Sequence, residues 1–369
     1  MMNTTTRSAK YPHQAGLSLI ELMIALALGL VLTLGVVQIF LGSSKTYRLT
    51  DGLALIQENM RFALGNLQYN ARMAGHMGCL VGPPENQLDE NDSAYDEAIY
   101  DINQGAVRGW EASGTGLGST FTITSLAPSG TWSNGSGDGL PTSITGDIIV
   151  GTDVLMIKSG SEADVVLNGN PNGNGNTLGV VDNSNIPQGS ILVVVAGDCG
   201  VGDLFQTTNA LSGTLTKGAG TPGNKTGGAD FKGDYDDDGS VFLFASTTYY
   251  IGVGASGQPA LFRERLDAGD SSGAIELVEG VENMQVLYGV ANNIDANPRA
   301  DTYSPASAVT NWNQVVSVRI ALLMRAGDNI IDEPAANTYN LIGTQITTQS
   351  DRRARLMGSA TVAIRNRLE

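Results

Sequence analysis

Apolar residues are concentrated at the start of the chain. Residues 17–41 form a mostly apolar run that contains a single carboxylate, Glu21. A run of this length is enough to cross the roughly 30 Å hydrocarbon core of a membrane as a helix. An ionised carboxylate inside such a span costs roughly 2.5–3.5 kcal/mol on insertion scales, so we expect Glu21 to have a partner and a function.

The apolar pattern continues beyond residue 41 with a helical period. Apolar residues recur at spacings of three, four or seven: Leu49, Leu53, Ile56, Met60, Ala63, Leu67 and Ala74. This spacing places them on one face of an α-helix, and no proline interrupts the pattern. The sequence therefore predicts one long helix with an apolar half, residues 17–41, and an amphipathic half, residues 42–78, with a break at Gly75-His76-Met77-Gly78.

In the rest of the chain, short apolar runs typical of strands alternate with polar stretches typical of loops. Strand-like runs are residues 121–123, 147–150, 153–158, 191–196, 241–244, 247–252, 282–290, 314–325 and 360–365. Stretches rich in Gly, Ser, Asn and Thr, at 127–146, 159–189 and 209–230, predict long loops. The expected fold class is α+β, with the long helix packed on an antiparallel β-rich globular domain, residues 79–369.

Charge limits the partners of the chain. The formal net charge is −16, and Lys and Arg cluster only in the last twenty residues, which argues against a nucleic-acid-binding surface. Residues 1–16 carry Arg7 and Lys10 and no acidic residue, which predicts a cytoplasmic N-terminus with the globular domain in the periplasm. Loss of these two positive charges would change −16 to −18.

Three interpretations of the N-terminus compete. A secretory signal peptide has an apolar region of 7–15 residues followed by its cleavage site. Here the apolar run is longer, and the only plausible cleavage site, Gly16, precedes it. A plain signal anchor fits the length but does not account for Glu21, five residues after Gly16. The third interpretation is a short leader, residues 1–16, whose removal leaves the apolar segment on the mature protein.

The segment from Gly16 through Glu21 resembles the N-terminus of type IV prepilins. The resemblance implies that a prepilin peptidase/N-methyltransferase cuts after Gly16 and methylates Leu17. It also implies that Glu21 meets the α-amino group of a neighbouring subunit. The family usually has Phe where this chain has Leu17. Because leucine keeps this position apolar, we expect processing to occur.

Later segments resemble the PilW group of minor pilins: residues 57–63, 72–75, 78–79, 198–199, 203–205, 249–252, 261–263, 277–282, 284–289, 315–320 and 361–367. The resemblance implies a pilin-like fold and a role in type IV pilus assembly, in a priming complex near the pilus tip. The implied partners are other minor pilins and the major pilin, with a tip adhesin as a further candidate. The chain would be a single-pass inner-membrane protein before assembly and part of the surface pilus afterwards.

Two other functions remain open. A minor pseudopilin of a type II secretion system has the same N-terminal chemistry, and a membrane-anchored periplasmic calcium-binding or adhesive module would never polymerise. Enzymatic activity is not expected. The sequence has no G-x-S-x-G, no HExxH and no phosphate-binding glycine loop, and leader removal leaves His76 as the single histidine.

The two cysteines, Cys79 and Cys199, form an even pair, for which a disulfide is the simplest state in an oxidising periplasm. Two buried free thiols are the alternative.

One acidic motif indicates a candidate cofactor, calcium. Asp234, Asp236 and Asp238 precede a glycine in the D-x-D-x-D-G order that begins a calcium loop. Ala245 occupies the twelfth position, where an EF-hand needs a bidentate carboxylate, so a full EF-hand is excluded. A shorter calcium loop with help from Asp230 remains open, and a solvated acidic turn is the alternative.

Overall fold

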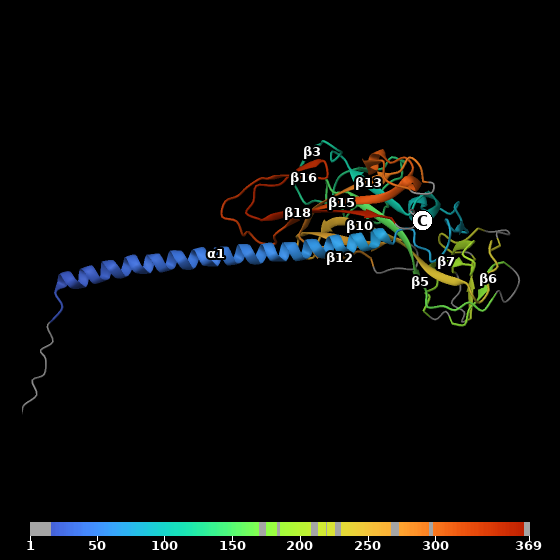
Figure 1. Cartoon of the computed structure of the whole chain (residues 1–369), viewed down its shortest axis with the longest axis horizontal. Coiled ribbons are helices and arrows are strands. Elements are labelled where there is room, and N and C mark those ends of the chain that lie inside the picture. The colour runs from blue at the N-terminus through green and yellow to red at the C-terminus, as the bar shows by residue number, and fades with distance from the viewer. Residues whose placement is uncertain are drawn as a thin grey trace, which may run out of the picture. The chain divides into compact units, whose positions relative to one another are not determined.

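The computed structural model describes residues 16–169, 175–182, 185–207, 213–218, 220–225, 230–266, 273–294 and 298–364. The chain divides into two compact units, Met1–Asp51 and Gly52–Glu369. The helix α1, Leu19–Arg72, contains 54 residues and contributes to both (Figure 1).

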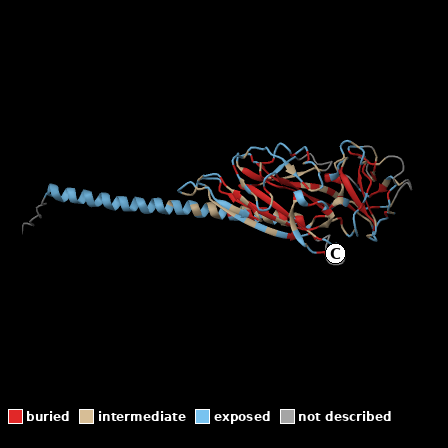
Figure 2. Ribbon diagram, turned by 90° about the horizontal axis from the view of Figure 1, so that it is seen from above, coloured by how far each residue is buried: buried red, intermediate tan, exposed pale blue. Residues whose placement is uncertain are grey.

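In the first unit, every residue from 16 to 43 is exposed (Figure 2). α1 contains an 18-residue window with a mean hydropathy of 2.5, long and apolar enough by length and composition to cross a membrane. This observation agrees with the predicted membrane-spanning half.

In the second unit, α1 buries the predicted face. Ile56, Met60, Ala63 and Leu67 are buried, which confirms the helical period read from the sequence. The helix ends at Arg72, however, and not at residue 78. Gly75 has φ +75° and donates its N–H to the Lys158 carbonyl oxygen at 2.8 Å, so the chain leaves the helix and docks on a strand.

The largest sheet has nine strands. Their bounds are β1 Glu85–Asn86, β2 Val107–Ala112, β4 Trp132–Ser133, β5 Val154–Glu162, β7 Ile191–Val195, β8 Gly202–Gln206, β10 Ser240–Val253, β11 Pro259–Arg265 and β12 Ile275–Glu279. The order is β1-β8-β7-β10-β5-β2-β4, with β11 on β10 and β12 on β11. All pairs are antiparallel except β1 with β8.

A second, fully antiparallel sheet has the order β14-β13-β15-β18. Its strands are β13 Val281–Val290, β14 Thr302–Pro305, β15 Val315–Arg325 and β18 Arg355–Ala363. Smaller sheets join β3 Thr120–Thr122 with β16 Thr338–Leu341 and β17 Thr344–Thr347, and β6 Thr177–Gly179 with β9 Thr214–Thr216. The short helices are α2 Glu97–Tyr100 and three single 3-10 turns, Ile102–Gln104, Ala306–Ala308 and Trp312–Gln314.

One hydrophobic core joins α1 to both large sheets. It contains the buried face of α1, Tyr249 and Leu261 from the nine-stranded sheet, and Val286 and Ile320 from the four-stranded sheet. The chain crosses between the sheets at Gly280, whose φ of +87° connects β12 to β13. The predicted α+β fold, a long N-terminal helix with a β-rich domain, is confirmed.

Individual strands differ from the prediction. Seven strands of four to seven residues lie outside every predicted run: β2, β8, β11, β12, β14, β16 and β17. The expected strands 241–244 and 247–252 are one continuous strand, β10. Residues 147–150 are not a strand, although Ile148 is buried: Ile149 makes an isolated bridge to Pro128 and donates its N–H to the Ile251 carbonyl oxygen at 2.8 Å. The expected loops also contain the short strands β4, β6 and β9, because strands of two or three residues leave no readable alternation.

Candidate functional site

The N-terminal end of α1 is held by a reciprocal pair of hydrogen bonds. The Ser18 N–H donates to Glu21 Oε2 at 2.9 Å, and the Glu21 N–H donates to Ser18 Oγ at 3.2 Å. This is a capping box, in which two backbone donors of the first turn are satisfied by side chains. The S-x-x-E spacing that produces it is present in the sequence and is the signal by which the capping box could have been predicted.

The capping box gives Glu21 a role within its own chain. It fixes the carboxylate at the N-terminal end of the helix, where the helix dipole favours negative charge. Within the described residues, Oε2 is the only Glu21 carboxylate oxygen that accepts a hydrogen bond. Gly16 and Leu17 directly precede the box. Their roles in processing, and that of Glu21 in assembly, stay predictions.

At its other end, α1 leads into a disulfide. Cys79 and Cys199 are bonded, with their Cα atoms 5.4 Å apart and a sequence separation of 120, so the predicted pairing is confirmed. Cys199 lies in the turn between β7 and β8, so the bond ties the segment after the helix to the nine-stranded sheet. Closing a loop of this length is worth about 4–5 kcal/mol in the chain-entropy model.

A partly open cavity of about 310 Å³ adjoins the disulfide. It is lined by Gly75, residues 77–84, Ile102 and Ala106. Its lining contains no acidic, basic or histidine side chain, so this cavity offers no general acid, base or charged ligand.

Two buried ionisable side chains act as ties between elements. Asp153 is buried, and its carboxylate accepts the backbone N–H groups of Ala112 at 3.1 Å and Val286 at 2.9 Å. It thereby joins the end of β2 to β13. Burial raises the pKa of Asp153 to about 8, and the nearby charge of Glu111 acts in the same direction.

Lys158 is the second buried tie. Its Nζ donates to the carbonyl oxygen of Asp101 at 2.6 Å, at the C-terminal end of α2. Burial lowers the pKa of Lys158 to about 7, and the charge of Arg108 adds to this effect. A cation at a helix C-terminus is favoured by the helix dipole, so this contact has a structural explanation.

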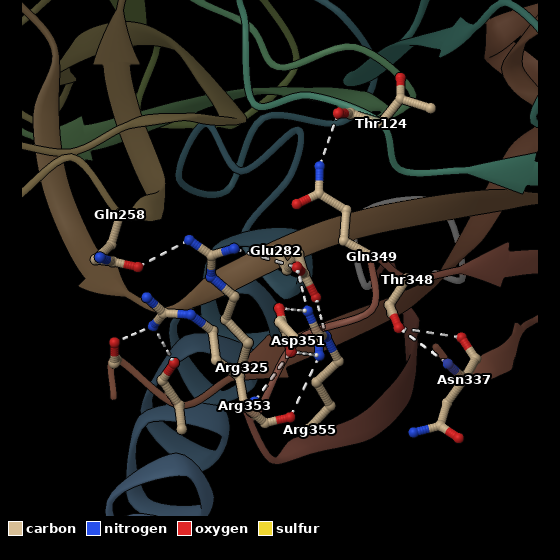
Figure 3. Close-up of polar contacts among 12 residues, drawn as sticks. Thr124, Gln258, Glu282, Arg325, Asn337, Thr348, Gln349, Asp351, Arg353 and Arg355 are labelled. Carbon is tan, nitrogen blue, oxygen red and sulfur yellow. Dashed lines mark hydrogen bonds and ion pairs between the residues drawn. The ribbon is translucent and has the colours of Figure 1, made fainter. Parts of the chain in front are cut away.

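An ion network fixes the beginning of β18 (Figure 3). The Arg355 guanidinium donates to Glu282 at 2.6 Å and to Asp351 at 2.7 Å, and its side chain is 1% exposed. Arg325 donates to the same Glu282 at 3.3 Å and to Gln258 at 2.8 Å. Glu282 belongs to β13, Arg325 to β15 and Arg355 to β18, so the network locks three neighbouring strands together.

The acidic loop proposed for calcium has its aspartates on the surface. Asp234, Asp236 and Asp238 are exposed, whereas Tyr235 between them is buried and donates its hydroxyl to Asp203 Oδ2 at 2.6 Å. Asp203, which the sequence analysis missed, holds this loop. No group of three or more His, Cys, Asp or Glu side chains suited to a metal ion occurs in the described part of the chain. The calcium site stays a prediction.

Two family models match the chain. Residues 11–37 match the prokaryotic N-terminal methylation motif, and residues 248–366 match the model of type IV pilus-assembly protein W. The chain is thus similar to the PilW family over residues 248–366 and to type IV prepilins at its N-terminus. No significant match to a curated protein or to a solved structure was found.

The two matches agree with the geometry. The methylation-motif match includes Gly16, Leu17 and Glu21 together with the apolar start of α1, and the PilW match extends from within β10 to three residues past the end of β18. The two matches together support a pilin related to the type IV pilus, and pilin-family domains point to a structural protein. Residues 38–247, which include the disulfide, lie outside both matches.

Proposed function

We propose that this chain is a minor pilin that joins other minor pilins in a complex that primes pilus assembly and lies near the pilus tip. The observation that carries the proposal is the match of residues 11–37 to the methylation motif, at the start of a helix apolar enough to span a membrane. A second match, to a pilus-assembly family, covers residues 248–366.

Processing would proceed in two steps. A prepilin peptidase/N-methyltransferase removes residues 1–16 and methylates the new amino group of Leu17. The apolar half of α1 then anchors the chain in the inner membrane, with the globular domain in the periplasm, until the chain enters the pilus.

Glu21 would act when the chain joins its neighbours. Its carboxylate would pair with the α-ammonium group of an adjacent subunit, and in a medium of low dielectric constant such a pair is much stronger than in water. The capping box engages only Oε2, so an incoming ammonium can approach the other oxygen while the cap persists. The pairing would set the axial register between subunits.

A deletion experiment tests the proposed function against the pseudopilin alternative. We expect deletion of the gene to abolish surface pili and twitching motility, to leave protein secretion normal, and to be complemented by the intact chain. Loss of protein secretion with normal piliation would contradict the proposal and favour a type II secretion pseudopilin.

A further inference from the structure

The outer edge of β18 carries unpaired backbone groups. β18 is the last strand in the order β14-β13-β15-β18, and among the described residues it pairs only with β15. Ile364 donates its N–H to the Val316 carbonyl oxygen, and Ala326 donates to Ala354, so even-numbered residues of this segment face β15. Because alternate residues of an antiparallel strand point to opposite sides, the odd-numbered residues have N–H and C=O groups directed outward.

These outward groups form a regular row. They belong to Met357, Ser359, Thr361 and Ala363, all of which are exposed. The pairing of β15 with β18 has no register shift across nine residue pairs, so the edge is not interrupted by a bulge. A strand added here could make main-chain hydrogen bonds along the whole length of β18.

After Arg355, whose charged side chain is buried, β18 lacks the features that normally protect an edge strand. Proteins usually block such edges with proline, lysine or other charged residues, or a bulge. Residues 356–364 read Leu-Met-Gly-Ser-Ala-Thr-Val-Ala-Ile, without a proline or a charge. The ion network at Arg355 also holds the first residue of the strand in place, so the edge is preorganised.

Charge indicates what kind of segment would bind. Four arginines besides the buried Arg355 lie at the two ends of this strand in the sequence, at positions 352, 353, 365 and 367, whereas the whole chain has a net charge of −16. Pairing with a second copy would bring two such basic stretches together and is disfavoured by repulsion. A strand with acidic residues near its ends has the complementary charge.

We propose that the outer edge of β18 receives an extended, acid-flanked strand from a different subunit of the pilus, which adds to the four-stranded sheet. This inference rests on the proposed function, because it assumes that the chain lies among other pilus subunits. It goes further by assigning the surface through which one neighbour is bound.

Proline substitution at an outward-facing residue tests the proposal in cells that make the pilus. In the full chain, Ser359→Pro removes an N–H that makes no bond to β15, and edge strands tolerate proline at such positions. Ser359→Ala is the matched control, because it changes the side chain and keeps the N–H. We expect Ser359→Pro to be processed and folded, with its melting temperature in detergent within about 5 °C of the unchanged chain.

The readout is the amount of each variant in sheared filaments. We expect Ser359→Pro to fall at least roughly tenfold, while Ser359→Ala is incorporated like the unchanged chain. Equal incorporation of the two variants would overturn the inference and leave the proposed function standing. Absence of the unchanged chain itself would overturn the proposed function, and the inference with it. A Ser359→Cys chain that crosslinks to a second copy would also overturn the inference.

If Ser359→Pro does not fold, amide hydrogen exchange on the unchanged chain tests whether a strand is added to the edge of β18. The amides of Met357, Ser359, Thr361 and Ala363 should exchange at least roughly tenfold more slowly in filaments than in detergent. The same exchange rates in both preparations would overturn the proposal.

Discussion

At the scale of single residues, the capping box shows that Glu21 serves its own helix. A carboxylate in an apolar run suggests an intermolecular partner, and the methylation-motif match supports that interpretation. The structure adds an intramolecular role, because Glu21 and Ser18 satisfy each other's backbone N–H groups. The two roles make different predictions for substitutions at these positions.

Replacing Glu21 should impair assembly without preventing membrane insertion. Glu21→Ala removes the proposed partner of the neighbouring α-ammonium group, while the apolar run remains long enough to insert. We expect normal levels in the membrane fraction and strongly reduced levels in sheared filaments, both measured by immunoblot.

Ser18→Ala is the matched control for loss of the cap. It costs the helix end about 0.5–2 kcal/mol but keeps the carboxylate. We expect it to enter filaments nearly as well as the unchanged chain. Normal incorporation of Glu21→Ala would contradict the assembly role, and an equal defect in both variants would assign the effect to capping alone.

At the scale of elements, long periodic segments could be predicted and short or tertiary features could not. The buried face of α1 could be predicted because its apolar residues recur with a helical period. Four of them, Ile56, Met60, Ala63 and Leu67, are buried in the structure. The end of the helix at Arg72 depends on a hydrogen bond from Gly75 to a strand 83 positions later, at Lys158, which no local pattern reveals. Residues 147–150 were wrongly predicted as a strand because a buried turn has the same apolar composition as a strand.

Buried polar ties between elements were the other features missed by the sequence analysis. Asp203 and Asp153 look like ordinary loop or strand-end aspartates in the sequence, and only the fold shows that each accepts backbone N–H groups from distant segments. By contrast, the disulfide was predictable because the chain has only two cysteines.

Asp153 should make stability depend on pH. Its pKa is about 8 in the folded chain against an ordinary value of 3.8, so between these pH values the folded state keeps a proton that the unfolded chain has released. The free energy of unfolding should therefore fall as pH rises through this range, by up to about 1.4 kcal/mol per pH unit. Urea denaturation of the full chain in detergent at pH 5 and pH 8 measures this difference.

Asp153→Asn provides the comparison. The amide lowers stability at both pH values, because its nitrogen cannot accept a hydrogen bond and one of the two backbone N–H groups, of Ala112 or Val286, loses its acceptor. It cannot titrate, however, so the difference in stability between pH 5 and pH 8 should shrink. An unchanged difference would show that other groups cause the pH dependence.

At the scale of the whole molecule, the chain combines a membrane-compatible helix with a β-rich domain whose C-terminal part carries the family match. The fold class and the family could be predicted from the sequence, because the N-terminal motif and the runs between residues 249 and 367 are local patterns. The unprotected edge of β18 could not be predicted from the sequence. It depends on which strands pair and on which backbone N–H and C=O groups of β18 face away from β15.

The central claim is that this chain is processed at Gly16 and enters the pilus. Mass spectrometry of sheared surface filaments tests it most directly, through a search for the peptide that begins at Leu17 with a methylated amino group. The account predicts that this peptide is present in the filaments. Detection only of an uncut form that begins at Met1 or Met2, confined to membranes, would contradict it and indicate an anchored periplasmic protein.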